Sequence, residues 1–137
     1  MGFTTPCLIR KNTPELRRKL KELGYYCNPC LGWNNLYTFV FGLASVRSVS
    51  DDGINVLSEK TDNIIDCGTN KELFLAIAAL RDDTDKHQWF TDENKWIQCS
   101  EIKFSTYWVY NDIDMNLDAI HKATVNELIE HFKGEEK

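Results

Sequence analysis

The fold class follows from the stretch Ile64-Ile65-Asp66-Cys67-Gly68-Thr69-Asn70-Lys71-Glu72-Leu73, in which a short apolar run leads directly into a helix start. The apolar run is typical of a buried strand. A small polar residue followed within three positions by Glu72 is the pattern of a capping box. The same pattern recurs at 12–16 and at 124–128. The chain therefore predicts capped helices set among strands.

Three helices are expected from these starts. The segment 14–23 carries a narrow seam of leucines among charged residues, and Gly24 suits the left-handed position after a helix end. The segment 70–81 is apolar around most of its circumference, which indicates a buried central helix. The segment 125–133 shows an apolar stripe at helical spacing.

Short strands are expected between the helices. Asp52-Gly53 between two apolar runs predicts a tight hairpin, and the strict alternation at 113–119 predicts either a strand or an extended loop. The expected strands are 7–9, 36–41, 44–49, 54–57, 63–67, 88–90, 95–99 and 104–110. We therefore expect one α+β domain over residues 1–137, with a mainly antiparallel sheet and three capped helices, the middle one buried.

The composition limits the class of protein. A chain of 137 residues with 42% hydrophobic residues is long enough for one domain with a real core. The longest apolar run, 73–80, is far shorter than the ~20 residues that span a bilayer, so no membrane partner is expected. The cysteine count of five is odd and no secretory signal precedes it, which favours free thiols and a cytoplasmic location.

The charge is distributed unevenly. Residues 1–50 carry seven basic and two acidic side chains, a net charge of +5, whereas the remainder carries nine basic and nineteen acidic ones, a net charge of −10. Such a split is typical of a surface that meets a charged partner. The alternative, which we favour, is that the two parts face each other within the fold or in a homo-oligomer.

One basic cluster is a candidate binding site. Along a helix it would follow a phosphate backbone, and an aromatic side chain nearby would stack on bases. The acidic pI of about 5.2 instead favours the solvated face of an amphipathic helix. The candidate binding residues are Arg10, Lys11, Arg17, Arg18, Lys21 and Trp33.

The cysteines offer two further candidates. Cys27 and Cys30 have the spacing of a zinc-ligand pair or of a redox pair, but no second motif supplies the remaining zinc ligands. Cys67 lies just before a helix N-terminus, where the dipole can activate a nucleophile. The alternatives are two incidental thiols in a loop and a small buried residue that ends a strand.

Other catalytic and ligand-binding patterns are incomplete. The oxygens of 112–118 begin like a calcium loop, but Leu117 and Ala123 occupy the positions of the required Gly and Glu. The glycines form no phosphate-binding loop, and no pair of carboxylates can be singled out among 21 acidic residues. We therefore predict no catalytic residue and no cofactor.

Two segments carry a resemblance. The segment 73–83, together with Gln88-Trp89-Phe90, and the opening segment 5–16 resemble segments of small uncharacterised proteins of bacterial phages and mobile elements. The resemblance implies a bacterial intracellular setting and no particular function.

These observations favour a non-enzymatic protein-interaction module, a phage or mobile-element accessory whose protein partner is unidentified. One alternative is nucleic-acid binding through the basic helix 14–23. Another is a cysteine-based enzyme or a zinc protein that uses Cys27 and Cys30 or Cys67.

Overall fold

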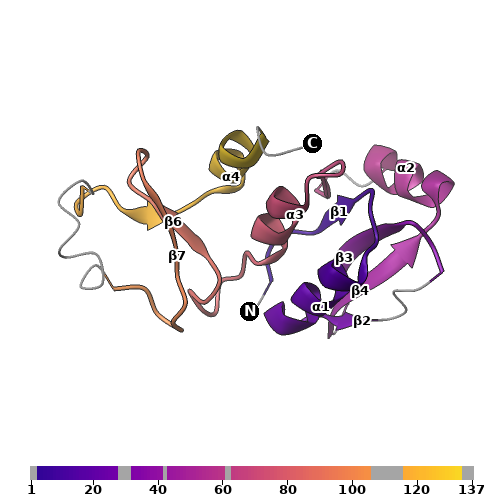
Figure 1. Cartoon of the computed structure of the whole chain (residues 1–137), viewed down its shortest axis with the longest axis horizontal. Helices are drawn as coiled ribbons and strands as arrows, with labels where there is room; N and C mark the ends of the chain where they lie inside the picture. The colour runs from indigo at the N-terminus through magenta and orange to yellow at the C-terminus, as the bar shows by residue number, and fades with distance from the viewer. Residues whose placement is uncertain (1–2, 28–31, 42, 61–62, 106–115, 134–137) are drawn as a thin grey trace.

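The computed structural model describes residues 3–27, 32–41, 43–60, 63–105 and 116–133. Within these ranges helices and strands alternate irregularly along the chain (Figure 1). Their order is β1 (Cys7–Ile9), α1 (Pro14–Leu23), β2 (Tyr26–Cys27), β3 (Asn35–Phe41), β4 (Leu43–Val49), α2 (Asp51–Lys60), β5 (Ile65–Asp66), α3 (Lys71–Ala78), β6 (Trp89–Thr91), β7 (Trp96–Gln98), β8 (His121–Lys122) and α4 (Val125–Phe132).

The first sheet has the strand order β2-β4-β3-β1-β5. Its centre is antiparallel: β3 pairs with β4 along its whole length and with β1 at Leu8↔Tyr37. The two outer strands, β2 and β5, pair in parallel with their neighbours. Because successive side chains of a strand point to opposite faces, Cys7 and Ile9 join the helix-covered core, whereas Leu8 points to the other face.

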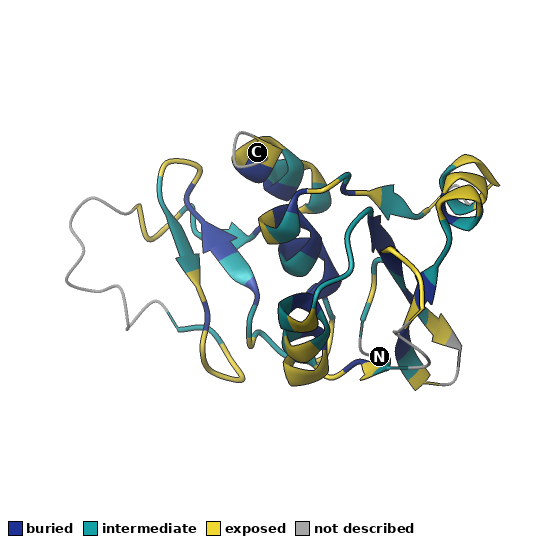
Figure 2. Ribbon diagram, turned by 45° about the vertical axis from the view of Figure 1, so that its right-hand side comes forward, coloured by how far each residue is buried: buried dark blue, intermediate teal, exposed yellow. Residues whose placement is uncertain are grey.

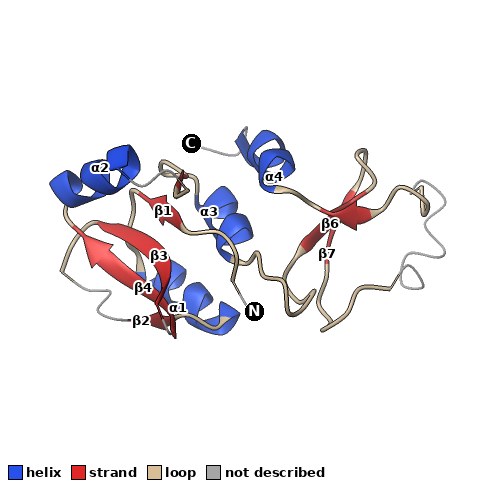
Figure 3. Cartoon of the chain, turned by 180° about the vertical axis from the view of Figure 1, so that it is seen from behind, coloured by secondary structure: helices blue, strands red, loops and turns tan. Residues whose placement is uncertain are grey.

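The second sheet is antiparallel, with the order β7-β6-β8. Its strands β6 and β7 are labelled in Figure 3. The predicted strands 88–90 and 95–99 are found as β6 and β7, which form a hairpin in which Phe90 pairs with Ile97. The predicted strand at 104–110 lies mostly outside the described residues, as do residues 113–115 of the segment 113–119, for which the sequence predicts a strand or an extended loop. The described end of the latter is a turn, in which the Ala119 N–H donates to the Asn116 carbonyl at 3.0 Å.

The helix α3 joins the two sheets. Figure 2 shows its buried residues at the centre of the molecule, between the first sheet and β6 and β7. Phe74 and Ile77 are fully buried, and the core cluster around them continues to Leu128 and Phe132 of α4. The α+β fold and its buried middle helix are therefore confirmed.

The hairpin predicted at Asp52-Gly53 is wrong, because these residues open α2, a fourth helix. The Ser50 hydroxyl accepts a hydrogen bond from the Gly53 N–H at 3.1 Å, and the Ser50 carbonyl accepts one from the Ile54 N–H at 2.9 Å. Two aspartates in the first turn suit the positive end of the helix dipole. These local bonds outweigh the preference of Asp-Gly for a turn.

The three predicted helix starts are found to within one residue, but the full capping box forms at one of them. At α4, Thr124 and Glu127 exchange both bonds of the box. Thr13 caps α1 and Asn70 caps α3, so that the third helical position is a leucine in both. Glu15 bonds instead with Lys71 of α3, at 3.1 Å. The predicted boxes at these two starts are therefore wrong, and α3 is capped by Asn70 and not by Thr69, the residue three positions before Glu72.

Candidate functional site

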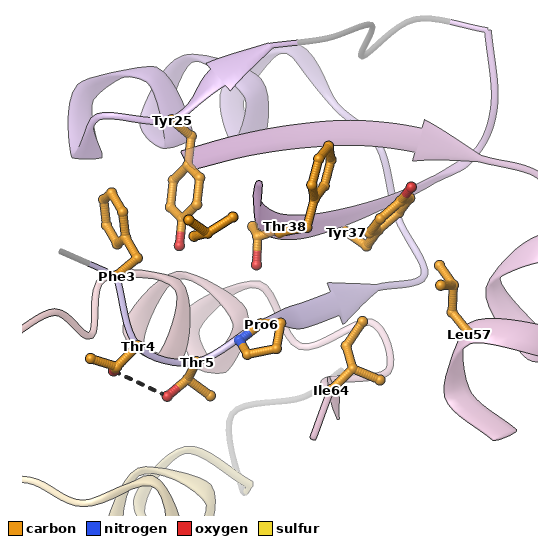
Figure 4. A pocket seen from close by; sticks show the side chains of 11 residues that line it. Phe3, Thr4, Thr5, Pro6, Tyr25, Tyr37, Thr38, Leu57 and Ile64 are labelled. Carbon is orange, nitrogen blue, oxygen red and sulfur yellow. Dashed lines mark hydrogen bonds between the residues drawn. The ribbon is translucent and has the colours of Figure 1, made fainter. Parts of the chain in front are cut away.

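A pocket lies where the N-terminal segment leaves the first sheet (Figure 4). The strand β3 continues to Phe41, but its pairing with β1 ends near Cys7. Before that point the chain turns to the end of α3, because the Thr4 N–H donates to the Leu80 carbonyl at 3.0 Å. The resulting space of about 410 Å³ is lined by Phe3, Thr4, Thr5, Pro6, Tyr25, Tyr37, Thr38, Phe39, Val40, Leu57 and Ile64.

The inner hydroxyl groups of this pocket already have partners. Tyr25 donates to the Ala78 carbonyl at 2.7 Å. The Thr38 hydroxyl accepts from the Cys7 N–H at 3.0 Å and donates to the Cys7 carbonyl at 3.4 Å. Burial raises the pKa of Tyr25, so its hydroxyl stays protonated at neutral pH. The inner wall therefore presents mainly apolar groups to an occupant.

One end of the pocket is an aromatic stack. Phe3 lies 4.2 Å from Tyr25, centroid to centroid, and the Arg81 guanidinium lies 4.3 Å from the Phe3 centroid. Two groups this close to one ring occupy its opposite faces. Asp83 holds Arg81 through hydrogen bonds of 2.6 and 2.8 Å. The edge of the Phe3 ring is therefore the part that it can offer to the pocket.

The apolar surface continues beyond the pocket. Val40 lines the pocket and is 58% exposed, and Leu43, at the other side of the same hairpin, is 64% exposed. Val40 pairs with Ala44 and Phe41 pairs with Leu43, so Val40 and Leu43 lie at one end of the sheet with their side chains on opposite faces of it. Exposed apolar side chains that adjoin a hollow are typical of an interaction surface.

The fold brings some of the predicted basic binding residues close together and separates others. The Arg17 guanidinium donates to the side-chain oxygen of Asn12, whose amide donates to the Trp33 carbonyl at 2.8 Å. Arg10 points elsewhere, to Asp66 at 2.9 Å and to Asn55 at 2.6 Å.

The remaining basic candidates lie on or near α1. Arg18 lies 3.9 Å from Glu22, Lys21 is exposed on the same helix, and Lys11 is half-buried before it. The Arg10–Asp66 pair joins the basic and acidic parts of the sequence, and the Lys71–Glu15 pair joins them with the opposite signs, so the favoured alternative stays a prediction. Nucleic-acid binding by α1 stays a prediction.

The cysteines divide into buried thiols and a disulfide. Cys7, Cys67 and Cys99 are free and buried. A hydrogen bond with Cys7, together with burial, raises the pKa of the Cys67 thiol, so the dipole of α3 does not produce a reactive thiolate. Cys27 is disulfide-bonded, against the expectation of free thiols, and Cys30 lies outside the described residues. Across the described ranges no three acidic, His or Cys side chains form a group that could hold a metal.

His121 is held by the second sheet and α4. Its Nδ1 lies 2.9 Å from the Ala119 carbonyl, and its Nε2 lies 2.9 Å from a Glu127 carboxylate oxygen. Both partners are acceptors, so the contacts fit the protonated imidazole, in which both ring nitrogens donate. Those contacts raise the pKa of His121. The contacts with the second sheet and α4 therefore favour the protonated form of His121.

Comparison of the chain with protein families, with curated proteins and with solved structures found no match. The similarity to phage and mobile-element proteins therefore stays a prediction. Among the described residues, no helix combines the length and apolar character needed to cross a membrane.

The pocket is the feature that the sequence analysis missed. Its walls come from the opening segment, the start of β2, β3, α2 and the approach to β5, which are separated by up to 61 positions between Phe3 and Ile64. No local sequence pattern indicates that these distant segments meet. One available signal was the run Leu36–Phe41, which is apolar or aromatic at nearly every position although the alternating pattern of a half-buried strand would leave one face polar.

Proposed function

We propose that this chain is a non-enzymatic protein-interaction module whose contact surface is the pocket together with the end of the β3–β4 hairpin. The observation that carries the proposal is that the exposed Val40 lines an apolar hollow while Leu43 is exposed at the same end of the sheet. Both side chains gain from removal from water, at about 25 cal/mol per Å² of apolar surface.

A protein segment fits this surface better than a small molecule does. An occupant confined to about 410 Å³ would fill the pocket and leave Leu43, which does not line it, in water. A polypeptide segment can insert one side chain into the pocket and cover the hairpin end with its neighbours. Such central anchors surrounded by weaker contacts dominate the energy of protein interfaces.

The test is a selection of displayed peptides against the full chain, followed by affinity measurements with the enriched sequences. Val40→Asp and Leu43→Asp place a charge in the proposed contact surface and should each weaken binding at least about tenfold, the effect of ~1.4 kcal/mol. Val56→Asp is the matched control, because Val56 is 50% exposed on α2 but does not line the pocket. It should change the affinity less than about twofold.

Two results would contradict the proposal. One is a set of enriched peptides whose affinity is unchanged by both hairpin substitutions. The other is an equal loss with Val56→Asp, which would place the contact on α2 or indicate a general loss of folding. Far-UV circular dichroism of each variant separates these two explanations of the second result.

A further inference from the structure

The pocket also shows which chemical groups it can receive. The described residues that line it include no Asp, Glu, Lys, Arg or His, so a charged occupant would find no counter-charge among them. The hydroxyls of Tyr25 and Thr38 are already hydrogen-bonded within the protein. An apolar group therefore displaces water from the inner wall without leaving a protein hydroxyl unpaired.

The aromatic walls disfavour a cation. A cation is held over the faces of aromatic rings, but Phe3 has Tyr25 on one face and the Arg81 guanidinium on the other. Its free edge carries partial positive charge. Phe39 likewise has the Arg47 guanidinium 5.9 Å from its centroid. Two guanidinium groups thus lie beside the rings that would otherwise attract a basic group.

We infer that the pocket receives one uncharged apolar side chain of the partner, aliphatic or aromatic, and rejects lysine and arginine. The inference rests on the proposed function for the origin of the occupant, since it takes the occupant to be part of a protein. The volume of about 410 Å³ lies within the range of sites that enclose small organic groups. The side chains that set this selectivity are Phe3 and Phe39 with their two arginines.

Two small probes of nearly equal shape test the inference on the full chain. Ethylbenzene and benzylammonium differ in a methyl group that is replaced by an ammonium group. Titrations followed by two-dimensional amide NMR should show ethylbenzene shifting the signals of Tyr37, Thr38 and Leu57. Benzylammonium should bind at least about tenfold more weakly at low ionic strength.

Three variants locate the binding and its selectivity. Leu57→Trp fills the pocket from α2 and should abolish the shifts caused by ethylbenzene. Val56→Trp adds the same ring one position away, at an exposed residue outside the lining, and should leave them unchanged. Arg47→Gln removes one guanidinium and should narrow the difference between the two probes by about threefold at low salt, with ethylbenzene unaffected.

Results that overturn the inferred selectivity of the pocket differ from results that reject the proposed function. Equal affinities for the two probes, no binding of ethylbenzene, or binding that survives Leu57→Trp would overturn the inference. None of these results depends on peptides or on the hairpin end. Conversely, a pocket that selects ethylbenzene, in a protein whose peptide ligands ignore Val40 and Leu43, would confirm the selectivity and reject the proposed function.

Discussion

His121 and Glu127 join the second sheet to α4, because the His121 Nε2 donates to the Glu127 carboxylate, whose two oxygens lie 2.9 and 3.0 Å from it. Glu127 also accepts the Thr124 N–H at 2.9 Å, the reciprocal bond of the capping box. One carboxylate therefore serves both the helix start and the strand before it. The Thr124 N–H, followed by the bond from His121, lowers the pKa of Glu127.

The first prediction concerns alkaline pH. The folded-state pKa of His121 is raised above its ordinary value of 6.5, so its contribution to stability is complete below that value and is lost as the pH rises through the folded pKa. Because the pair is partly exposed, we expect a loss of about 0.5 kcal/mol. Thermal unfolding between pH 5.5 and 9 should show this step in the wild type.

Two variants control this measurement. His121→Ala should remove the step. Glu127→Gln retains an oxygen acceptor for the Thr124 N–H but removes the charge, so it should flatten the step without the full loss of the helix cap. A step of unchanged size in both variants would assign it to another group.

The second prediction concerns acid. The Asp92 carboxylate accepts backbone hydrogen bonds from Asn116 at 2.7 Å, Lys95 at 2.8 Å and Asn94 at 2.9 Å, which lower its pKa to about 2. A depressed folded-state pKa adds stability above the ordinary value of 3.8, and this stability is lost as the pH falls towards 2.

Asp92→Asn should therefore lower the melting temperature at neutral pH and reduce its fall between pH 4 and 2. Circular dichroism melts at several pH values measure both effects. An acid transition identical to that of the wild type would show that Asp92 does not pin the turn of the second sheet. Glu93→Gln, at the exposed neighbouring position, is the control and should leave the acid transition in place.

Local signals decide how much of this fold the sequence predicts. The bounds of α1 agree with the prediction because Thr13, Pro14 and Gly24 act within one turn of its ends. Local signals gave the wrong prediction at Asp52-Gly53, because the sequence there is compatible with both a hairpin and a helix start. The bond from the Gly53 N–H to the Ser50 hydroxyl distinguishes the two, and nothing in the flanking pattern reports it.

The surroundings of Arg10 and the pocket could not be predicted because they depend on residues that are far apart in the sequence. Arg10 looks like a free cation in the sequence, and its pairing with Asp66 requires the parallel contact of β1 with β5 across more than fifty residues. The pocket likewise arises because the opening segment bonds with Leu80 and not with β3. Long-range pairing of this kind leaves no periodic trace in the chain.

The third prediction tests the inner wall of the pocket. Thr38 is buried, and its hydroxyl bonds with both the N–H and the carbonyl of Cys7. Thr38→Val has nearly the same shape but leaves both backbone groups without that partner, which should cost about 1–3 kcal/mol. Urea unfolding measures this loss.

Hydrogen exchange separates the lost bond from lost packing. Thr38→Ser keeps the hydroxyl and removes a methyl group, worth about 0.8 kcal/mol. The Cys7 amide should exchange faster in Thr38→Val and at nearly the wild-type rate in Thr38→Ser, relative to the global stability of each. Equal protection in both variants would mean that the Thr38 hydroxyl does not hold β1 in place.

The last prediction concerns Asn70, which uses both ends of its side-chain amide. Its oxygen accepts the Leu73 N–H at 3.0 Å and caps α3, while its nitrogen donates to the Phe132 carbonyl at 2.7 Å, near the end of α4. Asn70→Ala removes a cap worth about 1 kcal/mol and a buried hydrogen bond of similar value. We expect a loss of about 2 kcal/mol, read from urea unfolding.

Asn70→Ser divides this loss into its two parts. Serine keeps the cap but is too short to reach α4, so it should cost about 1 kcal/mol. Because the Phe132 carbonyl belongs to the helix that packs against both α3 and Trp89, the serine variant should also increase amide exchange at the end of α4 while leaving the start of α3 protected. A serine variant as unstable as the alanine variant would mean that the bond to Phe132, and not the cap, carries the stabilisation by Asn70.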